Sequence, residues 1–173
     1  MQSSPVPQQQ RRLQVTPRGA PPAGQVTVKL TGMPPLTGLR IGFGSLQEHQ
    51  FIGRTASDAE GNATETVRIP DWAQRDKVHY FFMAYDDMQP RGFSDAFHVT
   101  GPDGMARVSG VIGDEGGSCS PLRNASDDLY TLIGDTREFK AGSRVVVRGR
   151  VVEGAPCGDL GIAIAVTEIR SAL

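Results

Sequence analysis

The chain contains two cysteines, Cys119 and Cys157, and both lie in segments rich in glycine and proline. A zinc site would need further cysteine or histidine ligands nearby, but all three histidines lie within the first 100 residues. A thioredoxin-like centre would need a C-x-x-C pair, which the sequence lacks. We therefore predict a structural disulfide between Cys119 and Cys157. Two buried or free thiols are the alternative.

Three arginines, Arg144, Arg148 and Arg150, lie in the run 143–153, SRVVVRGRVVE. They alternate with valines, so a strand here would bury the valines and display the arginines on its opposite face. Such a face is a candidate site for phosphate groups or for an acidic glycan.

Aromatic residues beside these arginines are few. The second half of the chain offers Tyr130 and Phe139, both at positions where core residues are expected. Binding of single-stranded nucleic acid usually needs aromatic platforms on which bases stack. We therefore expect a solvated arginine face and no nucleic-acid partner.

Catalytic motifs are absent from the sequence. There is no G-x-S-x-G, H-E-x-x-H or paired-acid pattern, and Ser118 and Ser120 have no histidine in their half of the chain to activate them. Asp58, Glu60 and Asn62 resemble the start of a calcium loop, but the glycine is misplaced and the later bidentate glutamate is missing. We predict no enzymatic activity, no catalytic residue, no metal and no cofactor.

Composition excludes several classes of protein. The 173 residues include 18 Lys and Arg against 19 Asp and Glu, without the basic bias of a nucleic-acid-binding domain. No apolar run approaches the roughly 20 residues of a membrane helix, so no membrane span is expected. Residues 1–12 are polar, and we predict that they are disordered. They lack the apolar core of a signal peptide but fit the stub left after one is removed, the alternative being a cytosolic protein.

Short alternating runs separated by turn residues fill residues 13–101. They are 13–17, 25–32, 39–43, 51–56, 63–70, 78–85 and 94–100. The run 78–85, VHYFFMAY, is apolar on both faces and predicts a central strand in which His79 is packed. This pattern favours a β-sandwich.

A second set of runs follows the short turn Gly101–Gly104, which we interpret as a domain boundary. These runs are 105–113, 129–134, 143–153 and 160–169. Gly149 lies within one of them, where a bulge or bend would help a small sheet to close. We predict an all-β protein in which a sandwich at 13–101 precedes a small OB-type barrel at 105–173.

Two resemblances refine this expectation. The segments PRGAPPAGQVTVKLTG, SDAEGNATETVRIPDWA and SDAFHVTG resemble immunoglobulin-like modules of bacterial envelope proteins. The paired cysteines and the F-x-x-G-x-x-V-x-V-x-G run from Phe139 to Gly149 resemble an uncharacterised bacterial family of small OB-like β-domains, a resemblance that covers most of the second half. The second family implies no catalytic residues.

Together these features predict a non-enzymatic binding or adhesion module of the bacterial cell envelope, periplasmic or secreted, with a protein or glycan partner. One alternative is an OB-type barrel that binds oligosaccharide or nucleic acid through the arginine face. Another is an accessory domain of a larger glycan-acting enzyme. A structural disulfide and an immunoglobulin-like module both fit an oxidising compartment.

Overall fold

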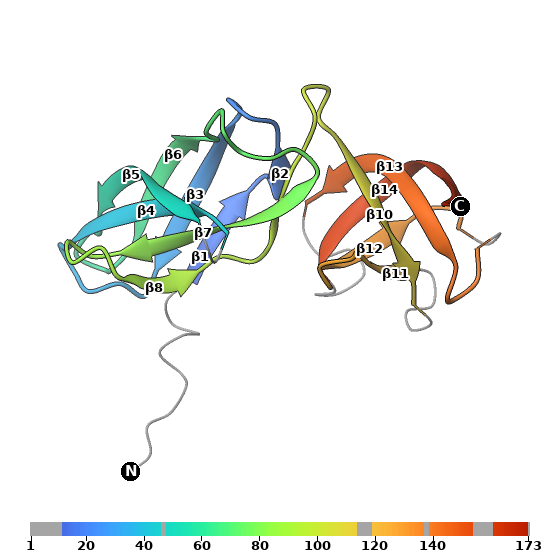
Figure 1. Ribbon diagram of the computed structural model, residues 1–173. Coiled ribbons are helices and arrows are strands. Elements are labelled where there is room, and N and C mark those ends of the chain that lie inside the picture. Colours follow the sequence, from blue (N-terminus) through green and yellow to red (C-terminus); the bar gives the residue numbers. More distant parts are fainter. Residues whose placement is uncertain (1–11, 46–47, 114–118, 137–138, 154–160, 173) are drawn as a thin grey trace, which may run out of the picture. The chain divides into compact units, whose positions relative to one another are not determined.

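The computed structural model describes residues 12–45, 48–113, 119–136, 139–153 and 161–172 (Figure 1). The regular structure in these ranges consists of strands, and no helix there is long and apolar enough to cross a membrane. The strands are β1 (Arg12–Thr16), β2 (Gly19–Ala20), β3 (Gln25–Thr31), β4 (Gly38–Gly44), β5 (His49–Ala56), β6 (Ala63–Arg68), β7 (Lys77–Ala84), β8 (Pro90–Phe93), β9 (Phe97–Val99), β10 (Met105–Ile112), β11 (Cys119–Arg123), β12 (Leu129–Ile133), β13 (Arg144–Val152) and β14 (Ile162–Ser171). The all-β prediction is confirmed.

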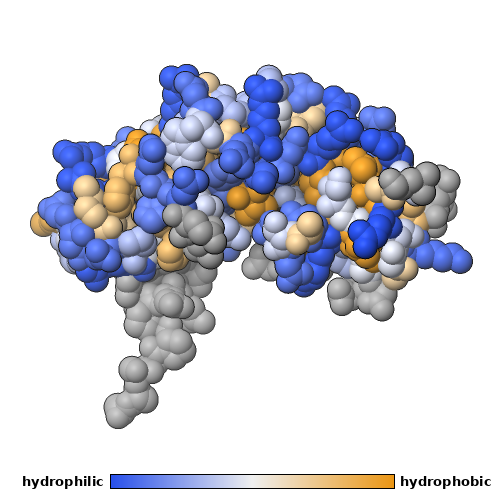
Figure 2. Space-filling model, viewed as in Figure 1, coloured by the Kyte–Doolittle hydropathy of each residue, from blue (hydrophilic) through white to orange (hydrophobic). Residues whose placement is uncertain are grey.

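Contacts divide the chain into two compact units. The first contains Ala23–Ala73 and His79–Phe97 with the N-terminal strand β1. The second contains His98–Leu173 together with Arg18–Pro22 and Gln74–Val78. This division differs from the predicted limits 13–101 and 105–173 by those two short segments and by residues 98–101, which belong to the second unit. Hydrophilic side chains dominate the visible surface of both units (Figure 2).

The first unit is built on two sheets. One has the antiparallel order β1-β3-β6, and the other contains β7-β4-β5 in that order, with β8 paired to β7. β2 pairs in parallel with β9, and the paired residues, Gly19 with His98 and Ala20 with Val99, belong to the second unit. Alternation along β3 buries Val28 and Leu30, as the sequence predicts. On β7, His79 is 6% exposed and stacks on Phe43 with ring centroids 4.9 Å apart, so its predicted role as a packed residue is confirmed.

The turn at residues 57–62 joins strands of these two different sheets. The Asp58 carboxylate accepts hydrogen bonds from the backbone N–H groups of Glu60 and Asn62, both at 2.9 Å. Gly61 has a φ of 82°, and a Cβ there would lie 2.2 Å from the carbonyl oxygen of Met33. Asp58 therefore closes the turn through hydrogen bonds from its side chain to the backbone. The sequence of this segment predicts a hairpin, and the structure corrects that prediction, because β5 pairs with β4 while β6 pairs with β3.

The second unit contains a closed barrel with the strand order β10-β11-β12-β14-β13 (Figure 1). Neighbouring strands are antiparallel except β12 and β14, which are parallel, and β13 pairs back onto β10. The interior contains side chains that are at most 1% exposed: Leu122, Tyr130, Leu132, Val145, Val147, Ile162 and Ile164. A small closed barrel was predicted, and the structure confirms it.

A bulge interrupts the pairing of β13 with β14. Arg148 pairs with Glu168 and the next residue, Gly149, pairs with Val166, so Thr167 is the extra residue on β14. The Thr167 hydroxyl donates a hydrogen bond to the Arg148 carbonyl oxygen at 2.9 Å. A Cβ at Gly149 would lie 2.2 Å from the carbonyl oxygen of Ala165, so this close approach requires glycine.

Candidate functional site

The outer face of β10, β13 and β14 carries the candidate site. In one row across the three strands, Arg107 pairs with Arg148, which pairs with Glu168. In the next row, Val146 pairs with Arg170 on β14. Paired residues on neighbouring strands lie about 5 Å apart and on the same side of the sheet, so these side chains share one surface.

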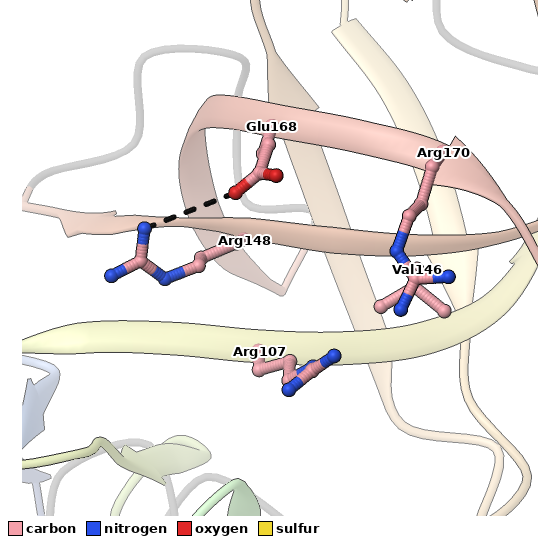
Figure 3. Close-up of a pocket in the computed structure, with 5 residues that line it drawn as sticks. All are labelled: Arg107, Val146, Arg148, Glu168 and Arg170. Atoms are coloured by element: carbon pink, nitrogen blue, oxygen red, sulfur yellow. Dashed lines mark ion pairs between the residues drawn. The ribbon is translucent and has the colours of Figure 1, made fainter.

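These residues line a shallow depression of about 210 Å³ (Figure 3). Its lining consists of Arg107, Val146, Arg148, Glu168 and Arg170. Three guanidinium groups and one carboxylate give the depression an excess of positive charge, although the whole chain has a formal net charge of −1. Val146, which is half-buried, is the apolar part of the lining.

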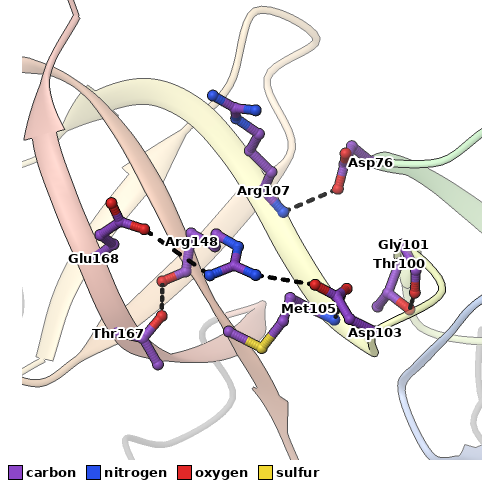
Figure 4. Close-up of polar contacts among 9 residues, drawn as sticks. All are labelled: Asp76, Thr100, Gly101, Asp103, Met105, Arg107, Arg148, Thr167 and Glu168. Atoms are coloured by element: carbon purple, nitrogen blue, oxygen red, sulfur yellow. Dashed lines mark hydrogen bonds and ion pairs between the residues drawn. The ribbon is translucent and has the colours of Figure 1, made fainter.

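Two carboxylates hold Arg148 (Figure 4). Its guanidinium donates to Asp103 Oδ2 at 2.9 Å and lies 3.9 Å from Glu168 Oε1. All three side chains are about half exposed or more, so these ion pairs position Arg148 and add little stability. Two acidic neighbours therefore offset the charge of Arg148.

Asp103 is presented by the turn Gly101–Gly104, which precedes β10. The turn is closed by the Gly104 N–H donating to the Gly101 carbonyl oxygen at 2.9 Å. A hydrogen bond from the Met105 N–H, and after it the charge and hydrogen bond of Arg148, hold the pKa of Asp103 below its usual value. Asp103 therefore stays ionised beside Arg148.

Arg107 and Arg170 differ from Arg148. Within the ranges that the structure describes, neither guanidinium forms a hydrogen bond or an ion pair within 4 Å. The backbone N–H of Arg107 donates to Asp76 Oδ1 at 2.9 Å, and the positive charge of Arg107 also helps to lower the pKa of Asp76. Two guanidinium groups that form no side-chain hydrogen bond or ion pair with the described residues therefore face the same depression, and Asp76 is the carboxylate on which the charge of Arg107 acts.

Only one of the three arginines predicted as site residues lines this depression. Arg148 lines it, whereas Arg144 and Arg150 lie further along β13 and do not. Arg107 and Arg170 were missed because they lie on other strands. Cys119 begins β11 and is half-buried. Cys157 lies outside the described residues, so the disulfide stays a prediction.

The second unit also contains a buried polar network. His98 is 0% exposed, and its Nδ1 lies 2.9 Å from the Tyr130 hydroxyl while its Nε2 lies 3.4 Å from Asp76 Oδ1. The tautomer that donates from Nε2 to Asp76 leaves Nδ1 to accept from Tyr130. Sequence reasoning placed His98 in the first domain and missed this contact with the barrel residue Tyr130.

We expect substitution of Asp76 to remove a pH-dependent contribution to stability. Burial raises the pKa of Asp76, but hydrogen bonds from His98 and the Arg107 N–H outweigh this effect and lower the pKa below 3.8. A lowered pKa means that the contribution is fully present above about pH 4 and is lost as pH falls through the folded-state pKa. In urea titrations, Asp76→Asn should have a lower free energy of unfolding than the wild type near pH 6. This difference in free energy should shrink as the pH falls towards 3. A difference independent of pH would contradict this assignment.

The described residues give the depression neither a metal site nor an aromatic surface. Within the described ranges, no group of three or more His, Cys, Asp or Glu side chains is placed to hold a metal ion. None of the residues that line the depression is aromatic. Its chemistry is therefore charge and hydrogen bonding by guanidinium groups, which suits an anionic ligand.

Comparisons with known proteins add little to this description. No protein-family model matches the sequence, and no curated protein matches it. Among solved structures, macromomycin matches with a TM-score of 0.42 and 17% sequence identity, over 52% of this chain and 99% of macromomycin. A likeness at that level carries no argument about function, so the proposals below rest on the geometry and the sequence.

Proposed function

We propose that this protein is a non-enzymatic binding module of the bacterial cell envelope whose barrel recognises an anionic ligand. The observation that carries this proposal is the depression on β10, β13 and β14, where three strands bring Arg107, Arg148 and Arg170 together. Arginine is suited to this role because its planar fork of N–H donors matches carboxylate, sulfate and phosphate groups.

The proposal includes the two fold resemblances. The strand order β10-β11-β12-β14-β13, with one parallel pair, supports an OB-like barrel for the second unit. Two separate sheets whose strands contribute buried apolar side chains support an immunoglobulin-like sandwich for the first. The envelope location is supported by the pair of cysteines and by the resemblance to envelope modules.

Retention on an immobilised sulfated polysaccharide tests the proposal. We expect the wild type to bind at low salt and to elute as salt rises. The guanidinium groups of the depression should bind the sulfate groups even though the whole chain has a net charge near zero, and salt screens this attraction. The triple variant Arg107→Gln, Arg148→Gln, Arg170→Gln should elute at clearly lower salt. The change should not unfold the protein, since all three side chains project from the outer face.

A second triple variant separates the depression from overall charge. Replacing Arg123, Arg144 and Arg150 with Gln removes the same number of charges from the barrel but none from the depression. We expect this variant to elute close to the wild type. Equal loss of retention in both variants would show that binding follows net charge and that the depression is not the site.

A further inference from the structure

We infer that the depression binds one carboxylate or sulfate group of an acidic glycan between Arg107 and Arg170, and that Glu168 limits the affinity by occupying Arg148. This inference rests on the proposed function and assigns it a ligand class. It separates the three arginines into two that receive the ligand and one that is already partnered.

The first step is the position of the two receiving arginines. Arg107 is on β10 and Arg170 is on β14, the two strands that flank β13. Val146 is on β13, between these two strands, and is paired with Arg170; both side chains line the depression (Figure 3). An anionic group above Val146 would receive N–H donors from both sides.

The second step is electrostatic. Like charges that face one depression repel each other, and an anion between them removes that repulsion. Arg148 does not need such an anion, because Asp103 and Glu168 compensate its charge. In Figure 3 the Arg148 guanidinium lies on the Glu168 side of the depression, away from Arg170. The guanidinium N–H groups that are available to bind an anion therefore belong to Arg107 and Arg170.

The third step is the ligand class. Among the described residues no aromatic side chain lines the depression, so bases of a nucleic acid would find no stacking platform there. The depression is shallow and has a single apolar residue, Val146, so it lacks the pockets with which peptide side chains are usually anchored. A sugar ring that carries a carboxylate or sulfate needs only a small apolar contact and donors for its charged group, and both are present.

Glu168 is the adverse element of this site. Its carboxylate lines the depression and would repel a bound anion, and it also engages Arg148 at 3.9 Å. Glu168→Gln removes the repulsion and releases Arg148 towards the ligand. Affinity should therefore rise in this variant, and a gain of binding cannot be produced by misfolding.

The experiment is calorimetric or fluorescence titration of the full chain at about 50 mM salt. The probes are an oligogalacturonate, which offers only carboxylates, a heparin-derived hexasaccharide, a single-stranded oligothymidylate and a poly-glutamate peptide. We expect glycan affinity to fall at least about tenfold in Arg107→Gln/Arg170→Gln and to rise about two- to fivefold in Glu168→Gln. The controls Arg144→Gln/Arg150→Gln and Glu60→Gln, the latter in an exposed turn of the first unit, should change affinity less than about twofold.

The outcomes separate this inference from the proposed function. If no probe binds the wild type, the proposed anion-binding function fails as well. If oligothymidylate or poly-glutamate binds better than both glycans, the anion site stands but the ligand class is overturned. If glycans bind and the Arg107/Arg170 variant is unaffected, or if Glu168→Gln weakens binding, the assignment of roles within the depression is wrong.

Discussion

Phe81→Ala should lower the free energy of unfolding of the first unit by about 3–5 kcal/mol, the range for deletion of a large buried aromatic side chain. Phe81 on β7 is 0% exposed, and its ring lies 4.8 Å from that of Phe43 and 5.2 Å from that of Phe97. The substitution leaves a cavity among aromatic rings that neighbouring strands hold in place. Trp72, the chain's only tryptophan, belongs to the same unit and contacts Phe43, so its fluorescence reports the transition in urea.

Phe93→Ala is the matched control for this prediction. Phe93 is on β8, next to β7, but is 51% exposed, and its ring lies 6.0 Å from that of Phe82. We expect its loss to cost no more than about 1 kcal/mol, because little apolar surface returns to water. Similar losses for both variants would show that the stability of this unit does not depend on the inner face of β7.

Removal of the predicted disulfide should cost the second unit about 4 kcal/mol, the chain-entropy value for a loop of roughly 40 residues. The comparison is wild type against Cys119→Ser/Cys157→Ser, with unfolding followed by circular dichroism. The transition seen by Trp72 fluorescence should stay where it is, because Trp72 belongs to the first unit. Intact-mass measurement after alkylation without reductant decides whether the bond exists. Two alkylated thiols in folded protein from its native compartment would end the hypothesis.

Local sequence patterns were sufficient for most of the strands. Alternation at 25–32 and 143–153 predicted β3 and β13, because a strand that buries one face needs apolar residues at every second position. The strands that were missed break this pattern. β8 begins at Pro90, β11 contains Pro121, and β2 has only two residues, Gly19–Ala20. β8 and β11 pair with the strands next to them in the sequence, whereas β2 pairs with the remote strand β9.

The candidate site was only partly predictable. The arginine pattern of β13 identified Arg148, but it gave equal weight to Arg144 and Arg150, which lie outside the depression. Nothing along one strand indicates which residues of other strands lie beside it. The registers of β10 and β14 against β13 bring Arg107 and Arg170 to Val146 and Arg148. Register depends on the turns, the bulge and the packing of the whole barrel.

What the sequence by itself determined is the class of fold, since short amphipathic runs with many glycines and prolines can bury their apolar faces only as sheets. The tertiary structure decided which charges meet. Strict alternation from Ile162 and Ile164 would turn Arg170 into the barrel. The extra residue Thr167, opposite the Arg148–Gly149 step, reverses the alternation and turns Arg170 outwards. A bulge reverses the side of the sheet on which each later side chain of the strand lies. The position of the bulge depends on contacts with the neighbouring strand, and a local sequence pattern does not contain this information.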